Sequence, residues 1–189
     1  MNLLIEELSL PGIKLVTPKK FGDERGFFSE TFNARTFAQV GIGTPFVQDN
    51  HSLSATRGTV RGLHFQAPPH AQDKLVRVVR GKILDIVIDI RQGSPTYGRH
   101  VGVELSAENW TQLWVPVGFV HGFCTLVPDT EVIYKVTNYY APQAELGVRW
   151  SDPALCIVWP EFAGAVVSAK DASLPPMREF ESPFHFERA

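Results

Sequence analysis

Apolar and polar positions alternate along the middle of the chain. Two β-rich runs lie on either side of Gly81, within residues 74–90. In an extended second run, the side chains would fall on two faces, with Leu84, Ile86, Ile88 and Ile90 on one and Asp85, Val87 and Asp89 on the other. This alternation predicts a half-buried strand, and the glycine between the two runs predicts a hairpin.

Similar short runs recur further along the chain, separated by Pro, Gly, Asn and Asp. They cover residues 100–105, 112–115, 119–127, 131–138 and 147–150. The 15 glycines and 14 prolines can form the corners between them. Many short strands with turn signals at this spacing indicate a sandwich or barrel. Helical patterns are confined to 33–40, which Asn33 can cap, and to 169–174, which precedes two prolines.

The length and composition indicate one sizeable core, since 189 residues include 44% hydrophobic residues. We expect a single domain over residues 1–189, with a β-rich N-terminal segment (1–47), a core (48–151) and a C-terminal tail (152–189) that packs on the core. The stretch 3–16 has too few strand partners in a small sandwich. It would leave an exposed sheet edge unless it paired with another chain.

The charge balance argues against general binding to nucleic acid or to an anionic membrane. The net charge is −2, so the chain lacks an overall basic field. Residues 1–10 do not have the pattern of a signal peptide, and no apolar run reaches the roughly 20 residues that span a bilayer. We therefore expect a cytoplasmic protein. Cys124 and Cys156 both sit in apolar runs and are expected to be reduced and buried.

Two stretches carry most of the candidate chemistry, residues 57–74 and 116–123. Their spacing resembles the paired motifs of the cupin family. The second motif of that family, Pro-x-Gly-x-x-His, is intact here and ends at His121. The usual first motif has a glutamate ligand, then six residues, then a glycine. Here Lys74 occupies the glutamate position before Gly81.

A cation at a ligand position would repel a divalent metal, because metal sites need deprotonated, electron-rich donors. The chain therefore resembles a cupin without its metal, and we expect neither a metal nor another cofactor. For any one of His64, His70 and His121 taken alone, an ordinary loop or core histidine is the simpler interpretation.

A wider resemblance extends over nearly the whole chain, in order and with matching spacing. It rests on residues 23–30, 48–52, 61–66, 115–123, 134–140 and 168–171. These blocks resemble the dTDP-4-dehydrorhamnose 3,5-epimerase family. The resemblance implies an all-β, cupin-like double-stranded β-helix, or jelly-roll barrel, with a β-rich N-terminal extension and a few short helices. It also implies a homodimer in which N-terminal segments add to the neighbour's sheet.

The same resemblance assigns catalytic roles to four residues: His64, Asp171, Lys74 and Tyr134. His64 would be the base beside a ketone, and Asp171 would fix its tautomer. Lys74 would stabilise the enolate oxygen, and Tyr134 would be the acid on the other face. Taken singly, Asp171 reads as a helix cap, Lys74 as a solvated cation and Tyr134 as an apolar strand residue.

The remaining family positions would bind the substrate, a dTDP-4-keto-6-deoxy-hexose. They are Phe21, Arg25, Phe28, Glu30, Gln48, Asp49, Asn50, Arg61, His121, Tyr140, Glu145 and Lys170. Guanidinium groups suit phosphate oxygens, and Tyr140 is placed to stack on thymine. The role of Glu145 stays open. The alternative for Arg25, Glu30 and Glu145 is a solvated charge pattern on a β-rich surface.

The leading hypothesis is therefore an isomerase of L-rhamnose biosynthesis. It would invert C3 and C5 of dTDP-4-dehydro-6-deoxy-D-glucose and give dTDP-4-dehydro-L-rhamnose. A C3-only epimerase or a ketoisomerase of the same family is the nearest alternative, because both begin with the same proton abstraction. A metal-dependent cupin dioxygenase and a non-catalytic sugar-binding cupin are hypotheses of other classes.

Overall fold

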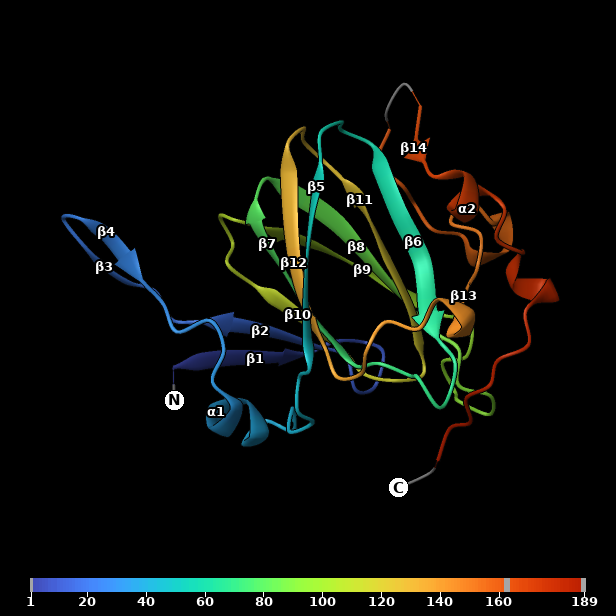
Figure 1. Ribbon diagram of the computed structural model, residues 1–189, viewed down its shortest axis with the longest axis horizontal. Coiled ribbons are helices and arrows are strands. Elements are labelled where there is room, and N and C mark those ends of the chain that lie inside the picture. Colours follow the sequence, from blue (N-terminus) through green and yellow to red (C-terminus); the bar gives the residue numbers. More distant parts are fainter. Residues whose placement is uncertain (1, 162–163, 188–189) are drawn as a thin grey trace.

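Two β-sheets of mainly antiparallel strands pack face to face as a jelly roll in the computed structural model, which describes residues 2–161 and 164–187 (Figure 1). The first sheet has the order β1 (Leu3–Glu7), β2 (Lys14–Pro18), β10 (Gln112–Val115), β7 (Lys74–Arg80), β12 (Thr130–Val136) and β5 (Gln48–Ser54). The second has the order β13 (Glu145–Gly147), β6 (Thr59–Gln66), β11 (Phe119–Thr125), β8 (Lys82–Asp89) and β9 (His100–Ser106), and β14 (Val166–Val167) pairs with β6. The predicted all-β fold is confirmed.

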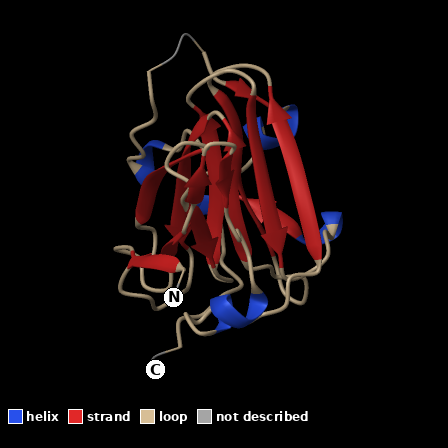
Figure 2. Ribbon diagram, turned by 90° about the vertical axis from the view of Figure 1, so that its left-hand side faces the viewer, coloured by secondary structure: helices blue, strands red, loops and turns tan. Residues whose placement is uncertain are grey.

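Helices are few and short, and they lie at the periphery of the strands (Figure 2). They are α1 (Ala34–Ala38), α2 (Ala169–Ala172) and the 3-10 turns η1 (Pro142–Ala144), η2 (Pro153–Leu155) and η3 (Met177–Glu179). Asn33 caps α1 as predicted, because its side chain accepts hydrogen bonds from the backbone of Arg35 and Thr36. No helix in the described part of the chain is long and apolar enough to cross a membrane.

The main core lies between the two sheets. Its buried side chains come from both, including Val76 and Val132 from the first sheet and Val87, Leu105 and Phe123 from the second. Alternate residues of each strand point into this space, as the alternating sequence pattern requires.

A second core covers the outer face of the second sheet. Ile86, Ile88 and Ile90 pack there against Leu155 and Phe184 of the C-terminal tail. The prediction that β8 is half-buried was therefore wrong, although its two faces divide the residues as expected. Polar residues on the face opposite the isoleucines do not point to solvent, because that face looks into the space between the sheets, where Asp85 is fully buried.

The predicted hairpin around Gly81 is also wrong. β7 pairs with β10 and β12, whereas β8 pairs with β9 and β11, so the chain crosses from one sheet to the other at Gly81. Gly81 has a φ of 77°, and a Cβ there would lie 2.4 Å from Oγ1 of Thr130. Only glycine fits this corner without strain.

Two local predictions need correction near the C-terminal part of the core. The strand expected at residues 147–150 lies earlier in the chain, since β13 covers Glu145–Gly147. Cys124 is buried as expected, but Cys156 is exposed. Cys156 caps η2 in a left-handed conformation with φ 51°, so the chain turns there and its side chain is not enclosed by the apolar run around it.

The N-terminal stretch pairs within its own chain. β1 pairs with β2, and β2 pairs with β10 of the first sheet. The stretch thus finds partners in its own chain and extends the sheet by two strands, and β1 still forms the exposed sheet edge that was expected in the absence of a second chain. The outer edge of β1 ends the sheet, and Leu4 on it is 71% exposed.

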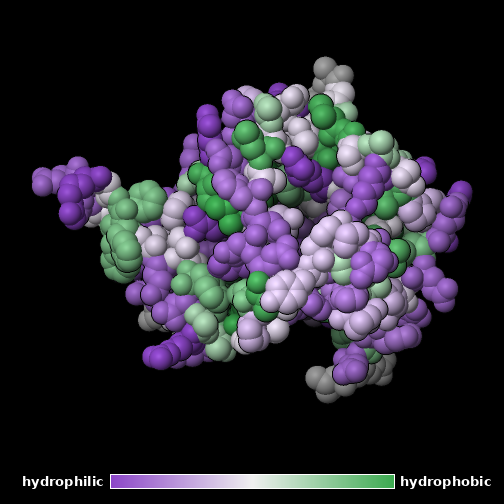
Figure 3. Space-filling view, in the orientation of Figure 1, coloured by the Kyte–Doolittle hydropathy of each residue, from purple (hydrophilic) through white to green (hydrophobic). Residues whose placement is uncertain are grey.

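An arm formed by residues 19–30 projects away from the barrel (Figures 1 and 3). It contains the small hairpin of β3 (Phe21–Asp23) and β4 (Gly26–Phe28), all of whose residues are exposed. Figure 3 shows a hydrophilic tip and apolar side chains nearer the body. The root of the arm is held by Trp110, whose indole donates to Ser29 and lies 4.1 Å below the ammonium of Lys20.

Candidate active site

A cavity of about 310 Å³ opens between the two sheets. The first sheet contributes β5, β7 and β12 to its wall, and the second contributes β6 and β13. The residues that line it are Gln48, Asn50, His64, Phe65, Gln66, Gln72, Lys74, Tyr134, Tyr140 and Glu145. Three of the four predicted catalytic residues therefore share one cavity, and the fourth, Asp171, contacts it through His64.

His64 is held by a carboxylate from the far end of the chain. Its Nε2 lies 2.9 Å from Oδ1 of Asp171, which is 107 residues away. The other oxygen of Asp171 accepts from the backbone N–H of Gly62, at 3.2 Å. Ser168 caps α2 by accepting from the Asp171 backbone N–H, and this cap fixes the aspartate at the strand.

The pKa of Asp171 is lowered by its hydrogen bonds. Burial by itself would raise it, but the hydrogen bond and charge interaction with His64 and the backbone donor of Gly62 outweigh burial. Asp171 is therefore ionised near neutral pH and can stabilise a positive charge on His64.

Glycines let the neighbouring strands approach His64 closely. β6 lies between β11 and β13, where a Cβ on Gly147 would lie 2.2 Å from the carbonyl oxygen of Leu63. A Cβ on Gly122 would lie 2.6 Å from the carbonyl oxygen of Arg61. These approaches hold the backbone of His64 between two strands and set the position of the imidazole.

Lys74 reaches the cavity from β7, and its ammonium lies 3.4 Å from the carbonyl oxygen of His64. Burial lowers the pKa of Lys74 to about 8, against the attraction of Asp85 and Glu145. A cation with this pKa is mostly charged at neutral pH, and it is available to an oxygen that becomes negative in the cavity.

His121 and Asp85 form a second pair below the cavity. The two side chains lie 3.0 Å apart between Nε2 and Oδ2, and both are buried. Burial raises the pKa of Asp85, while His121 and Lys74 oppose this effect. His121 was predicted to contact the substrate, but its side chain is paired with Asp85 and does not line the cavity.

Tyr134 faces the cavity from β12, across from His64 on β6. Burial raises the pKa of Tyr134, and the charges of Glu145 and Tyr140 raise it further, whereas the charge of Arg61 lowers it. A phenol that keeps its proton is suited to act as an acid.

Glu145 connects His64 to the mouth of the cavity. One carboxylate oxygen lies 3.5 Å from Nδ1 of His64, and the other accepts from the hydroxyl of Tyr140 at 2.6 Å and from the ammonium of Lys170 at 2.5 Å. Burial opposes its ionisation, but these donors outweigh burial and lower the pKa of Glu145.

Glutamines hold the loop that carries Tyr140. Gln48 accepts from the backbone N–H of Tyr140, and Gln66 accepts from the backbone N–H of Ala141 while it donates to two carbonyl oxygens. Gln66 and Gln72 line the cavity but were not predicted as site residues. The position of Gln66, two residues after His64 on one strand, could have placed it on the same face; no comparable signal marked Gln72.

Lys170 lies at this mouth, where it pairs with Glu145. The guanidinium of Arg61 donates to the hydroxyl of Ser54 and to the carbonyl oxygen of Leu53 on β5, and its charge acts on Tyr134.

Other predicted binding residues lie elsewhere. Asp49 is on the outer face of β5, paired with Lys135, because strand residues alternate and its neighbours Gln48 and Asn50 face inward. It borders a separate hollow of about 450 Å³ beneath α1.

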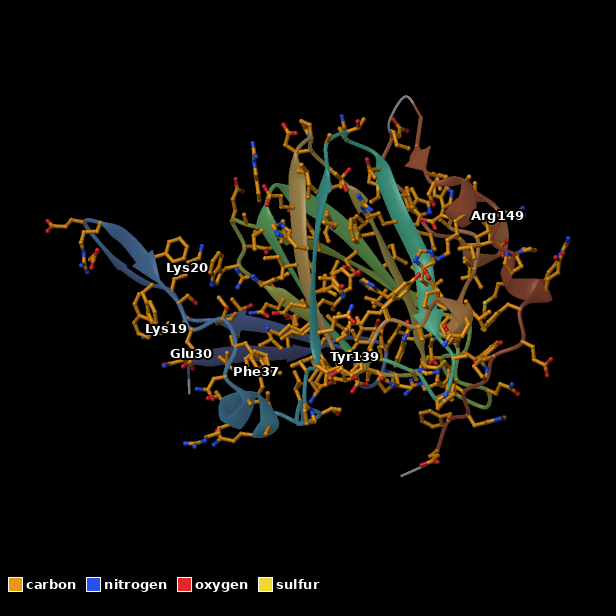
Figure 4. All side chains as sticks on the ribbon, viewed as in Figure 1. Lys19, Lys20, Glu30, Phe37, Tyr139 and Arg149 are labelled. Atoms are coloured by element: carbon orange, nitrogen blue, oxygen red, sulfur yellow. The ribbon has the colours of Figure 1, made fainter. Side chains whose placement is uncertain are left out.

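Four predicted binding residues sit on the arm and do not line the cavity of their own chain: Phe21, Arg25, Phe28 and Glu30. Figure 4 shows Glu30 at the root of the arm, well to the left of Tyr139, which neighbours the cavity. Arg25 forms an ion pair with Asp23 within the hairpin tip.

The donor set does not resemble a metal centre. In the described ranges, no three His, Cys, Asp or Glu side chains converge in an arrangement that could hold a metal ion. His64 and His121 each pair with a carboxylate, and the ammonium of Lys74 lies beside the same strand as His64.

The fold and the site together define a jelly-roll, cupin-like protein whose His64, Lys74 and Tyr134 share one cavity between its sheets. The model of the dTDP-4-dehydrorhamnose 3,5-epimerase family matches residues 7–179. The chain belongs to this family.

Relatives and solved structures resemble the chain over almost its whole length. A dTDP-4-dehydrorhamnose 3,5-epimerase of Sinorhizobium fredii is 50% identical over 98% of this chain and 95% of its own. The Legionella pneumophila epimerase, solved with dTDP-4-keto-L-rhamnose, has a TM-score of 0.94 and 41% identity over 98% of this chain and 100% of its own. The Bacillus anthracis enzyme, solved with TDP and PPi bound, has a TM-score of 0.90 and 47% identity over 93% of this chain and 99% of its own.

The buried position of Lys74 predicts an unusual titration. Its ammonium should lose its proton with a midpoint near pH 8, because burial disfavours the charged form. NMR of isotopically methylated lysines can follow this, with the Lys74 signal identified by its absence from Lys74→Arg. In the urea-unfolded protein, the midpoint of the Lys74 titration should rise to about 10.4. A midpoint of about 10 in the folded protein would contradict the buried position.

Proposed function

We propose that the protein inverts C3 and C5 of dTDP-4-dehydro-6-deoxy-D-glucose and so produces dTDP-4-dehydro-L-rhamnose. The observation that carries this proposal is the pair His64–Asp171, which faces Tyr134 across one cavity. Lys74 lies on the same side of the cavity as Tyr134, because its strand β7 pairs with β12. Epimerisation beside a ketone needs a base, a stabiliser of the enolate and an acid on the opposite face. These residues can fill the three roles.

His64 takes the proton from the carbon beside the ketone. Its Nε2 is engaged by Asp171, so Nδ1 is the nitrogen available to the substrate. The imidazolium that forms is stabilised by the ionised carboxylate of Asp171. The electron pair of the broken C–H bond passes into the enolate and places negative charge on the C4 oxygen.

Lys74 stabilises that oxygen. Its ammonium is fixed by burial and by its hydrogen bond to the carbonyl oxygen of His64, so little reorganisation is needed when charge develops. A preorganised donor of this kind is typically worth about 10²–10³ in rate.

Tyr134 returns a proton from the other face. It projects from the first sheet whereas His64 projects from the second, so a sugar ring between them would be approached from both sides. The phenolate that remains regains its proton from solvent, and His64 loses its proton to solvent. The same sequence at C5 completes the double inversion.

The nucleotide is bound at the mouth of the cavity. Arg61 and Lys170 supply cationic donors for a diphosphate, and the ring of Tyr140, 52% exposed, is available for stacking on thymine. Gln48 and Asn50 add neutral donors and acceptors on the inner face of β5.

A homodimer accounts for the residues on the arm. Phe28 is 70% exposed, and Phe27, although it packs edge-on against Trp110, is 55% exposed. Exposed apolar groups of this kind are typical of an interface. In a symmetric dimer each arm would reach the partner's cavity and bring Arg25, Glu30 and Phe28 to its substrate.

A cytoplasmic location belongs to the same proposal. It is supported by two free thiols, of which that of Cys156 is exposed, because an exposed free thiol suits a reducing compartment.

Replacing Tyr134 with phenylalanine should separate exchange from inversion. The ring and its packing stay, but the phenolic proton is lost, so His64 can return a solvent-derived proton only to the face it came from. Inversion, especially at C5, should fall by about 10²–10⁴-fold, while deuterium exchange at C3 falls much less. NMR of the reaction in heavy water follows label and configuration together. A parallel decline of both would remove Tyr134 from the acid role.

Mixing two inactive variants should test the dimer and its arm. His64→Asn lacks the base but has an intact arm, and Arg25→Ala has the base but a defective arm. If the arm serves the partner, a mixed dimer contains one complete site, and random exchange should restore about a quarter of wild-type activity. Light scattering should give the dimer mass. A monomer, or no restoration on mixing, would overturn this arrangement.

A further inference from the structure

Residues 138–141 carry Tyr140 between β12 and η1, and they lie outside the sheets. Side-chain amides from three separate places in the sequence bond to the backbone of this stretch. Gln48 of β5 accepts from the N–H of Tyr140 at 3.0 Å, and Gln72 donates to a carbonyl oxygen at 2.7 Å. Gln66 of β6 contacts the residues on both sides of Tyr140.

The amide of Gln66 makes three hydrogen bonds to backbone groups. Its Oε1 accepts from the N–H of Ala141 at 2.8 Å, and its Nε2 donates to the carbonyl oxygens of Tyr139 at 3.1 Å and His70 at 2.6 Å. Gln66 is 4% exposed and Ala141 is 6% exposed, so water does not readily replace these partners. An amide suits this position because it donates and accepts at once, whereas a carboxylate only accepts and an ammonium only donates.

The ring of Tyr140 depends on this restraint of its backbone. The residue is 52% exposed, and its hydroxyl donates to Glu145 at 2.6 Å, a contact that holds only the tip of the side chain. A ring that is already placed loses less conformational freedom when a base stacks on it. Bonds to the residues before and after Tyr140 therefore favour stacking without touching the base.

We propose that Gln66 is a positioning residue for nucleotide binding, and that it acts by setting the ring of Tyr140 for stacking on the thymine. The inference rests on the thymine contact in the proposed function. Gln66 follows His64 by two residues on β6, so both side chains leave the same face of one strand. One strand thus carries the base that removes the proton and the support of the nucleotide site.

Support of β6 alone is the alternative role for Gln66, and it predicts a different defect. If Gln66 only held its own strand in place, its loss would displace His64 and lower kcat. If Gln66 acts through Tyr140, its loss removes binding that is equal in the ground state and the transition state, which raises KM and leaves kcat unchanged.

Gln66→Met should separate these two roles. Methionine has similar length and no branch, but it leaves the three backbone groups without their partners. KM for the sugar nucleotide and the Kd of dTDP, measured by calorimetry, should each rise about tenfold, while kcat stays within about twofold. Gln92→Met is the matched control, because the amide of Gln92 also donates to a backbone carbonyl, that of Ser182 in the tail. It should leave both constants unchanged.

A double-mutant cycle tests whether Gln66 acts through the ring. Tyr140→Ala should weaken dTDP binding by about 10- to 100-fold, because it removes the stacking surface. Adding Gln66→Met to Tyr140→Ala should weaken dTDP binding by less than about twofold, since no ring remains to be positioned. Thermal unfolding checks that each variant folds. If Gln66→Met does not fold, Gln72→Met carries the same cycle with an expected loss of about threefold, because it removes a single bond of the same loop.

The outcomes separate the positioning role from the proposed function. A fall in kcat at unchanged KM, or an equal loss of dTDP affinity with and without the Tyr140 ring, would overturn the positioning role and leave the epimerase function in place. A wild type that shows the expected coupling in dTDP binding, but exchanges neither C3 nor C5 of the sugar substrate, would support the positioning role and overturn the epimerase function. A wild type without affinity for dTDP would overturn both.

Discussion

The hydrogen bond between His64 and Asp171 is the contact on which the site depends. It joins a central strand to a short helix in the C-terminal tail, across 107 residues of chain. Asp171 reaches His64 only because the tail covers the second sheet, where Phe184 and Leu155 pack on the isoleucines of β8. The apolar burial of the tail and the pairing of His64 with Asp171 are therefore parts of one arrangement.

Burial also determines the electrostatics beneath the cavity. Asp85 and His121 form a pair in the space between the sheets, and Lys74 lies close enough for the charge of Asp85 to oppose the loss of its proton. Charges removed from water interact more strongly with one another and with a substrate. The site thus contains a buried cation, and a carboxylate buried in the core helps to keep it charged.

Sequence patterns predicted the local structure of single strands and helices better than the pairing of strands into sheets. Alternation on β8 assigned its two faces correctly, and Asn33 marked the start of α1. The same pattern could not show that the tail would cover the outer face, or that Gly81 would turn the chain into the other sheet, because both depend on contacts distant in sequence. Periodicity also gave no reason to bring Asp171 to His64; that expectation came from the family resemblance.

The residues on the arm show a different limit of prediction from sequence. Family positions placed Arg25 and Glu30 with the substrate, yet the arm carries them away from the cavity of their own chain. No local pattern distinguishes a residue that serves its own site from one that serves a neighbour. The sequence of β5 was more informative, since its alternation separates Asn50 inside from Asp49 outside.

The central claim is that His64 removes protons on both sides of the ketone. The most direct test is NMR of dTDP-4-dehydro-6-deoxy-D-glucose in heavy water with the wild type and with His64→Asn. Asparagine keeps a polar side chain but cannot act as a base near neutral pH. The wild type should exchange C3 and C5, and the variant should exchange neither while it still binds dTDP. Exchange by the variant at the wild-type rate would contradict the role of His64.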